Sequence, residues 1–137
     1  MKDRNHLFDV GISHTVNIID KGTVDIPMLQ ILQPDGSAHS DADMPDMSQE
    51  TAHKIFQTMH YIRVLDERMV GAQRQGRISF YLACSGEEAS TVGSAAALSD
   101  NDMIMSQYRE QGALAYRGYR TEQFMNQMFS NKLDPNK

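Results

Sequence analysis

The fold is decided between residues 48 and 76, which read SQETAHKIFQTMHYIRVLDERMVGAQRQG. Apolar side chains recur there at spacings of three and four, which is the period of one helix face. They are Ala52, Ile55, Phe56, Met59, Ile62, Leu65, Met69 and Ala72. Ser48 can cap the first turn, and Gly76 stands where a glycine commonly ends a helix. The sequence therefore predicts one helix of about 27 residues, roughly 40 Å long, which exceeds the diameter of a domain this small.

Shorter elements are predicted after this helix. Residues 86–98 are expected to form a second helix, whose small side chains let another backbone approach closely, so we place it in a crowded interior. Residues 103–105, Met-Ile-Met, are expected to form a short buried strand. A short helix over residues 113–116 and a last helix capped by Thr121 complete this half.

The residues before the long helix have no such period. Residues 26–32 are apolar, but Pro27 restricts them to a sheet edge or a strand start, and residues 16–19 can be extended. Residues 34–36, Pro-Asp-Gly, are expected to form a turn. We therefore predict an extended N-terminal arm and linker over residues 1–47 and a largely helical domain over residues 48–137.

Composition narrows the class of protein. The chain has 137 residues, of which 40% are hydrophobic and 23% are charged, as in an ordinary globular protein. Its net charge of −5 argues against a nucleic-acid partner. No apolar run approaches the roughly 20 residues that span a bilayer, and the first ten residues lack the core of a secretory signal. One cysteine excludes an internal disulfide, so we expect a soluble chain from the bacterial cytosol.

The familiar catalytic motifs are absent from the sequence, so we assign no catalytic residue and no metal ligand. Cys84 is interpreted as a small buried side chain rather than a nucleophile. His53 and His60 are seven residues apart, which favours a solvated helix face over a metal site. Glu87 and Glu88 point about 100° apart on a helix, so we interpret them as partners of the helix dipole rather than an acid–base pair.

The strongest candidates for ligand binding are Gln107, Tyr108 and Arg109. They follow the predicted strand, which is where α/β folds place their ligands. A guanidinium offers a rigid fork of donors to phosphate oxygens, and a phenol adds a hydroxyl group. The alternative is an ordinary arginine paired with a carboxylate, such as Glu110 or Glu122.

The adjacent aromatic residues Phe80 and Tyr81 also have two interpretations. Aromatic side chains belong to the core by default. The less favoured alternative from the residues alone is that they form the wall of a ligand pocket.

Four sequence motifs, taken in their order along the chain, resemble those of a known family. They are R-Q-G-R-I-S-F-Y (74–81), G-E-E-A (86–89), V-G-S-A-A-A-L (92–98) and Q-Y-R-E (107–110). Each motif is weak alone, but their order and spacing together are specific. The chain resembles the E1 α subunits of branched-chain 2-oxo acid dehydrogenases, from about residue 26 to residue 137 and most strongly over residues 74–117.

The resemblance implies an α/β thiamine-diphosphate-binding fold, of which this chain is the largely helical N-terminal portion. In that family the tyrosine and the arginine of Q-Y-R-E contact the cofactor diphosphate, which here means Tyr108 and Arg109, with Gln107 beside them. The aromatic of I-S-F-Y lines the pocket for the branched substrate tail. That residue is Phe80, and we place Tyr81 in the same pocket. The Mg²⁺ ligands of the family are expected beyond Lys137.

The resemblance also implies partners. They are an E1 β subunit, with which the α subunit forms an α₂β₂ heterotetramer, the lipoyl domain of E2, and a small 2-oxo acid as the substrate. The implied activity is oxidative decarboxylation of branched-chain 2-oxo acids with transfer of the acyl group to the lipoyl group. Two alternatives stay open: an E1 α subunit for pyruvate or acetoin, and an inactive helical module that docks on a β subunit.

Overall fold

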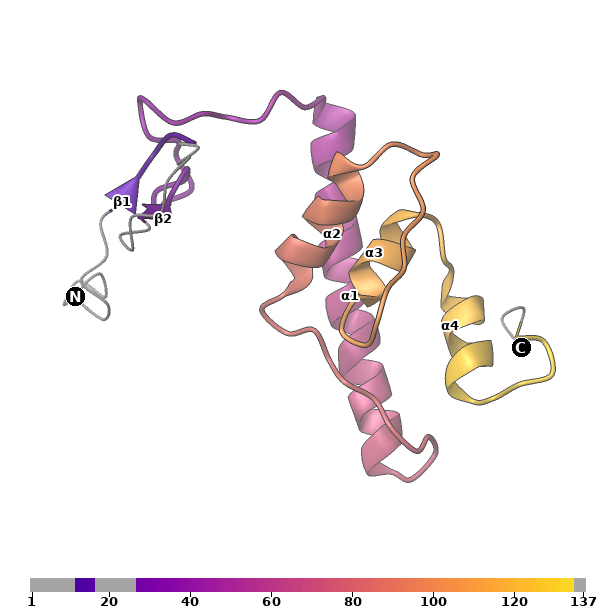
Figure 1. The fold of residues 1–137 in the computed structure, drawn as a ribbon. Helices are drawn as coiled ribbons and strands as arrows, with labels where there is room; N and C mark the ends of the chain where they lie inside the picture. Colours follow the sequence, from indigo (N-terminus) through magenta and orange to yellow (C-terminus); the bar gives the residue numbers. More distant parts are fainter. Residues whose placement is uncertain (1–11, 17–26, 135–137) are drawn as a thin grey trace. The chain divides into compact units, whose positions relative to one another are not determined.

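The computed structural model describes residues 12–16 and 27–134, so most of the extended segment expected over residues 16–19 lies outside the described residues. The chain divides into two compact units, Met1–Asp46 and Met47–Lys137 (Figure 1). Among the described residues, none of the helices combines the length and the apolar character that crossing a bilayer requires.

The first unit contains a two-stranded parallel sheet. Strand β1 (Ile12–Ser13) pairs with strand β2 (Met28–Leu29), with Ile12 opposite Met28. The expected turn at residues 34–36 is confirmed: Gly36 has φ of 87°, and an antiparallel bridge joins Leu32 to Ala38 across it. The described part of the arm therefore folds back on itself, which corrects the expectation of a chain that stays extended.

The long helix is confirmed as α1 (Gln49–Arg74). The Ser48 hydroxyl accepts a hydrogen bond from the Thr51 N–H at 3.0 Å, which satisfies one of the free donors of the first turn. Past the other end, Gly76 has φ of 69°, a left-handed conformation that stops the helix. The second half of α1 supplies core residues, which are Ile62, Leu65, Met69 and Ala72.

The apolar stripe of α1 is only partly buried. Phe56 was expected on the buried face, but 55% of its surface is exposed. Its ring packs edge-on against His60 one turn later, with centroids 4.6 Å apart. Helical period alone therefore overestimated the length of α1 that other described elements cover.

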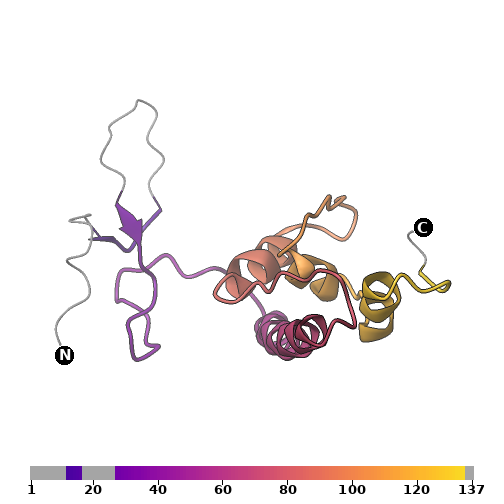
Figure 2. The same ribbon diagram turned by 90° about the horizontal axis from the view of Figure 1, so that it is seen from below.

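Two short helices pack against α1 and against each other. Helices α2 (Glu88–Ala97) and α3 (Gln111–Tyr116) lie on the same side of α1 (Figures 1 and 2). Helix α2 begins two residues later than expected because Gly86 has φ of 86°, which is incompatible with a right-handed helix. Its Val92 and Ala95 are buried, but its Ala89, Ser90, Ser94 and Ala97 are exposed, so only one face of this segment lies in the crowded interior that was expected.

The last helix is α4 (Thr121–Met128), whose Phe124 joins the core. The residue before the helix is Arg120, not the expected cap Thr121, and its N–H donates to Gln123 Oε1 at 2.8 Å. Thr121 is the first helical residue, and its hydroxyl lies 2.9 Å from the Tyr61 hydroxyl of α1. The hydroxyl thus serves a tertiary contact rather than a cap.

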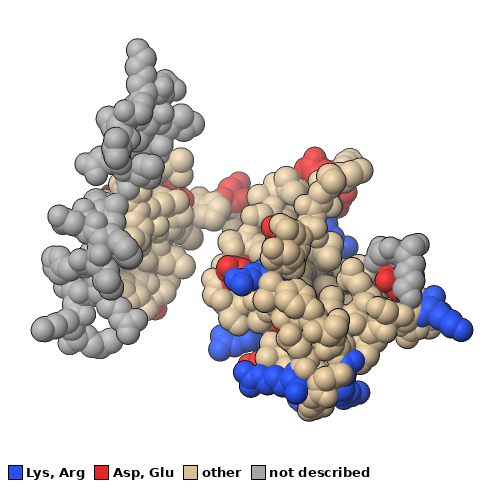
Figure 3. All heavy atoms as spheres, turned by 60° about the horizontal axis from the view of Figure 1, so that its bottom comes forward, with Lys and Arg blue, Asp and Glu red and all other residues tan. Residues whose placement is uncertain are grey.

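The short buried strand expected at Met103–Met105 is wrong. This segment has no regular structure, and Met103 and Met105 are 86% and 91% exposed. A strand needs a neighbour to pair its backbone, and the described residues of the helical unit, 47–134, contain no strand that could pair with this segment. Figure 3 shows both signs of charge on the visible face of the helical unit, with large uncharged areas between them.

Candidate functional site

A cavity of about 300 Å³ brings all the predicted site residues together. One wall is formed by the connector after α1, and the other by the segment before α3. Side chains of α3 and α4 close it. The lining residues are Phe80, Tyr81, Leu82, Ser106, Gln107, Tyr108, Arg109, Gln111, Leu114, Phe124, Gln127 and Met128. The cavity therefore combines an apolar interior with a group of hydrogen-bond donors on one wall.

The Q-Y-R-E segment forms a tight turn. The Gln107 N–H donates to Glu110 Oε2 at 2.6 Å, and the Glu110 N–H donates back to the Gln107 carbonyl at 3.3 Å. These two bonds close the turn and leave Tyr108 and Arg109 at its tip. Tyr108 is 64% exposed, so its hydroxyl group is accessible to a ligand.

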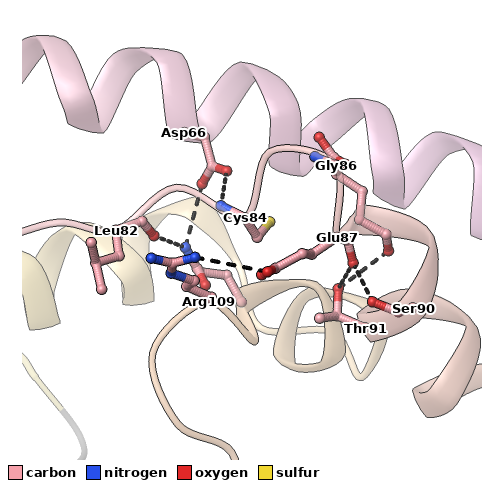
Figure 4. A network of polar contacts seen from close by, with 10 residues as sticks. Asp66, Leu82, Cys84, Gly86, Glu87, Ser90, Thr91 and Arg109 are labelled. Carbon is pink, nitrogen blue, oxygen red and sulfur yellow. Dashed lines mark hydrogen bonds and ion pairs between the residues drawn. The ribbon is translucent and has the colours of Figure 1, made fainter. Parts of the chain in front are cut away.

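Arg109 has an unusual backbone. Its φ is 70°, in the left-handed region that few residues other than glycine adopt. Such conformations cost free energy and concentrate at functional sites. The guanidinium lies 3.8 Å from the Glu87 carboxylate, and both side chains are 49% exposed (Figure 4). The sequence had suggested Glu110 or Glu122 as the ion-pair partner, and neither of them fills this role. Glu110 instead closes the turn.

Phe80 and Tyr81 take opposite directions in the wall. Phe80 is 59% exposed, whereas Tyr81 is buried in the core cluster. The Tyr81 hydroxyl donates to Asp66 Oδ1 at 2.5 Å. Burial, reinforced by the bond to Asp66, raises the pKa of Tyr81 well above its usual value of 10.0. Tyr81 therefore anchors the wall, and Phe80 is left free to contact a ligand.

The anchor of this wall is Asp66 of α1, which sequence reasoning missed. Asp66 is 3% exposed, and Oδ2 accepts the Cys84 N–H at 2.7 Å (Figure 4). The signal was available, because Asp66 lies four residues after Ile62 and three before Met69, on the buried face of α1. A charged residue at such a position needs buried donors, and the connector supplies them.

Gln111 of α3 was also missed. It is 8% exposed, and its Nε2 donates to the Leu82 carbonyl at 2.8 Å. The same nitrogen lies 3.1 Å from the Tyr81 hydroxyl and 3.4 Å from Asp66 Oδ1. Gln111 therefore joins the network that holds the connector, and no motif in the sequence marked it.

Cys84 behaves as the small buried side chain that was expected. It is fully buried, and burial together with the charge of Asp66 raises the pKa of its thiol to about 12. A thiol with this pKa stays protonated near neutral pH and is a poor nucleophile. The described residues contain no group of three His, Cys, Asp or Glu side chains arranged to hold a metal ion.

The two acidic residues before α2 are also engaged. Glu88 Oε2 accepts the Gly86 N–H at 2.7 Å, which stabilises the turn before the helix. Glu87 instead forms the ion pair with Arg109. The interpretation of Glu87 as a partner of the helix dipole did not predict this contact.

Comparison with known proteins now identifies relatives. The sequence model of the family described as "Dehydrogenase E1 component" matches residues 56–137. The chain is 46% identical over 109 residues to the Arabidopsis thaliana 2-oxoisovalerate dehydrogenase subunit alpha 1, mitochondrial, an alignment that covers 80% of this chain and 23% of that protein. It is 41% identical over 109 residues to the Caenorhabditis elegans subunit alpha and 40% identical over 112 residues to the Mus musculus subunit alpha. These two alignments cover 80% and 82% of this chain and 25% of each relative.

The comparisons correct one expectation and confirm another. These relatives are mitochondrial proteins of a plant and two animals, so the expectation of a bacterial cytosolic protein is wrong. The chain spans about a quarter of the length of the curated relatives it matches. The resemblance drawn from the four motifs is confirmed, and the family match extends over more than half of the chain. The chain belongs to the dehydrogenase E1 component family.

Proposed function

We propose that this chain is the N-terminal portion of an E1 α subunit that acts on branched-chain 2-oxo acids, with its cavity as one side of a thiamine-diphosphate site. One observation carries the proposal: Phe80 and Tyr81 meet Gln107, Tyr108 and Arg109 around a single cavity, although they are far apart in the sequence. The names of the relatives, all 2-oxoisovalerate dehydrogenase alpha subunits, support the same substrate class.

The donor set on the cavity wall fits a diphosphate. A guanidinium can donate two parallel hydrogen bonds to phosphate oxygens, and Tyr108 can donate a third. Arg109 is free to do so because its pair with Glu87 is long and half exposed, and such pairs contribute little. Gln107 lines the same wall, and its amide group can add a weaker contact.

The apolar part of the cavity fits a branched aliphatic chain. Phe80, Leu114 and Met128 present hydrocarbon surface there, and each buried CH₂ group contributes about 0.8 kcal/mol. When bound, thiamine diphosphate supplies the electron sink that decarboxylation of a 2-oxo acid requires. This chain supplies contacts and orientation: Tyr108 and Arg109 contact and orient the diphosphate, and Phe80 covers part of the substrate tail.

The remaining parts of the site are assigned to partners. We infer that an E1 β subunit completes the site in an α₂β₂ heterotetramer and that a lipoyl domain of E2 receives the acyl group. The proposal places the ligands of Mg²⁺ outside these 137 residues.

Titration calorimetry with pyrophosphate and with thiamine diphosphate tests the site. The chain, co-expressed with the β subunit of a 2-oxoisovalerate dehydrogenase, is expected to bind both. Arg109→Lys should weaken both by about tenfold, because a lysine cannot form the bidentate pair. The matched control is Arg68→Lys, an exposed arginine of α1 outside the cavity, which should change neither affinity. Equal affinities in the two variants, or no binding by the wild type, would refute the proposal.

The chain without a partner should be inactive. Tyr108 and Arg109 are largely exposed, and two exposed donors hold only one end of the cofactor. We therefore expect no measurable release of carbon dioxide from 2-oxoisovalerate when the purified chain is mixed with thiamine diphosphate and Mg²⁺. Turnover under these conditions would contradict the division of the site between subunits.

A further inference from the structure

The cavity has two walls that are held in different ways. The wall of residues 106–110 is closed by the reciprocal bonds between Gln107 and Glu110. The opposite wall belongs to the connector of residues 78–83, which makes no backbone–backbone hydrogen bond within the described part of the chain. Side chains of two helices hold this connector instead.

Those side chains are Asp66 and Gln111. Asp66 binds the Tyr81 hydroxyl and the Cys84 N–H, and Gln111 binds the Leu82 carbonyl. Gln111 is also the first residue of α3, directly after Glu110. Gln111 therefore continues the backbone of the wall of residues 106–110, and its side chain is hydrogen-bonded to the opposite wall of residues 78–83.

The orientation of the Gln111 amide is fixed by its surroundings. Its Nε2 faces three oxygens, those of Leu82, Tyr81 and Asp66. Exchanging the amide nitrogen and oxygen would set the carbonyl oxygen against the carbonyl of Leu82 and the carboxylate of Asp66. The Oε1 atom is buried and has no hydrogen-bond partner among the residues that the structure describes. The unpaired acceptor offsets part of the stability that the contacts of Nε2 contribute.

We propose that Gln111 is a specificity-determining residue, which sets the spacing of the two walls and thereby the size of the acyl chain that the cavity admits. Its backbone positions the turn that carries Tyr108 and Arg109. Its side chain fixes Leu82, and through Tyr81 it fixes the neighbouring Phe80. The inference rests on the proposed function, because it takes the occupant of the apolar part to be the tail of a 2-oxo acid.

The test uses Gln111→Met, which keeps the volume and removes the donors. The first measurement is nuclear magnetic resonance of the labelled full chain. In the wild type we expect sharp Leu82 methyl signals and cross-relaxation between the Phe80 ring and residues 106–108. In Gln111→Met the Leu82 methyl signals should broaden, and the cross-relaxation between the Phe80 ring and residues 106–108 should weaken. Gln57→Met, the same exchange at an exposed glutamine of α1, is the control and should change neither.

The second measurement compares pyruvate with 2-oxoisovalerate, each titrated in the presence of thiamine diphosphate into the chain co-expressed with the β subunit of a 2-oxoisovalerate dehydrogenase. The wild type should prefer the branched acid by about a hundredfold, since this acid has two more carbons than pyruvate and each added methylene in a fitted pocket contributes about tenfold. Gln111→Met should reduce this preference to less than about threefold. Should Gln111→Met fail to fold, Tyr81→Phe, which leaves the bond to Leu82 in place, should give an intermediate preference.

The outcomes separate the two claims. If the wild type binds both acids and Gln111→Met or Tyr81→Phe keeps its full preference, the inference on Gln111 is wrong and the proposed function stands. Unchanged cross-relaxation between the walls in Gln111→Met overturns the inference in the same way. If the wild type binds neither acid, the proposed function fails and the specificity role fails with it.

Discussion

Gly112 offers the sharpest test of how the site is supported. It lies in α3, directly after Gln111, and faces α2. A Cβ atom at this position would overlap Thr91 Oγ1 and would lie 2.9 Å from Val92 Cγ2. Val92 is fully buried, and the Thr91 hydroxyl is bonded to the Glu88 carbonyl at 3.2 Å, so neither neighbour can easily move away. The glycine is therefore needed for the close packing of α3 against α2.

The effect of Gly112→Ala can be estimated from two opposing contributions. Overpacking a well-filled contact costs about 1–3 kcal/mol. Alanine gains up to about 1 kcal/mol over glycine in a helix, and less in a first turn. We therefore expect a net loss of about 1–2 kcal/mol in the free energy of unfolding. Binding of pyrophosphate should weaken as well, because α3 supports the turn of residues 107–110.

The assay is urea unfolding followed by circular dichroism, with Gly93→Ala as the matched control. Gly93 lies in α2, and a Cβ there meets nothing within 4 Å, so this variant should be stabilised by up to about 1 kcal/mol. If Gly112→Ala and Gly93→Ala have the same free energy of unfolding, the close approach of α3 to α2 in the structure does not exist in solution. The support of the site would then have to come from other contacts.

Three further expectations follow from single residues. Arg109→Gly should raise the free energy of unfolding by about 1 kcal/mol, because glycine adopts the φ of 70° without strain. The same variant should weaken pyrophosphate binding. A loss of stability would contradict the strain argument. The pKa of Tyr81 is raised above its unfolded value of 10.0, so the stability that it contributes is complete below about pH 10 and falls as the pH rises further; Tyr81→Phe should show a smaller alkaline loss in unfolding measured from pH 9 to pH 11. Cys84, with a thiol pKa of about 12, should resist iodoacetamide at pH 8 in the folded chain and react once urea unfolds it; rapid reaction with the folded chain would show that the thiol is accessible.

The sequence predicted best what depends on local pattern. The period and the caps of α1 were sufficient, because Ser48 and Gly76 act within one turn of the chain. The predicted site residues met at one cavity because the motif order of the family carried that information. Their roles in binding stay predictions.

The failures concern contacts between distant segments. The segment Met103–Met105 has the composition of a strand, but strand formation depends on a partner that sequence period cannot provide. Phe56 fits the stripe of α1, but its exposure depends on which elements cover the helix. The ion-pair partner of Arg109 was sought in Glu110 and Glu122, whereas the fold supplies Glu87 from the start of α2.

The structure separates rigid support from exposed chemistry. Asp66, Tyr81, Cys84 and Gln111 are buried and bonded to one another, whereas Tyr108 and Arg109 are 64% and 49% exposed. Hydrogen bonds to a phosphate are weaker in water than in a site from which water is excluded. Two donors placed at a fixed turn but left open to solvent therefore orient a diphosphate more than they hold it. This arrangement supports a site in which another protein surface closes over the turn, and it predicts that affinity for pyrophosphate rises when that surface is supplied while the effect of Arg109→Lys grows with it.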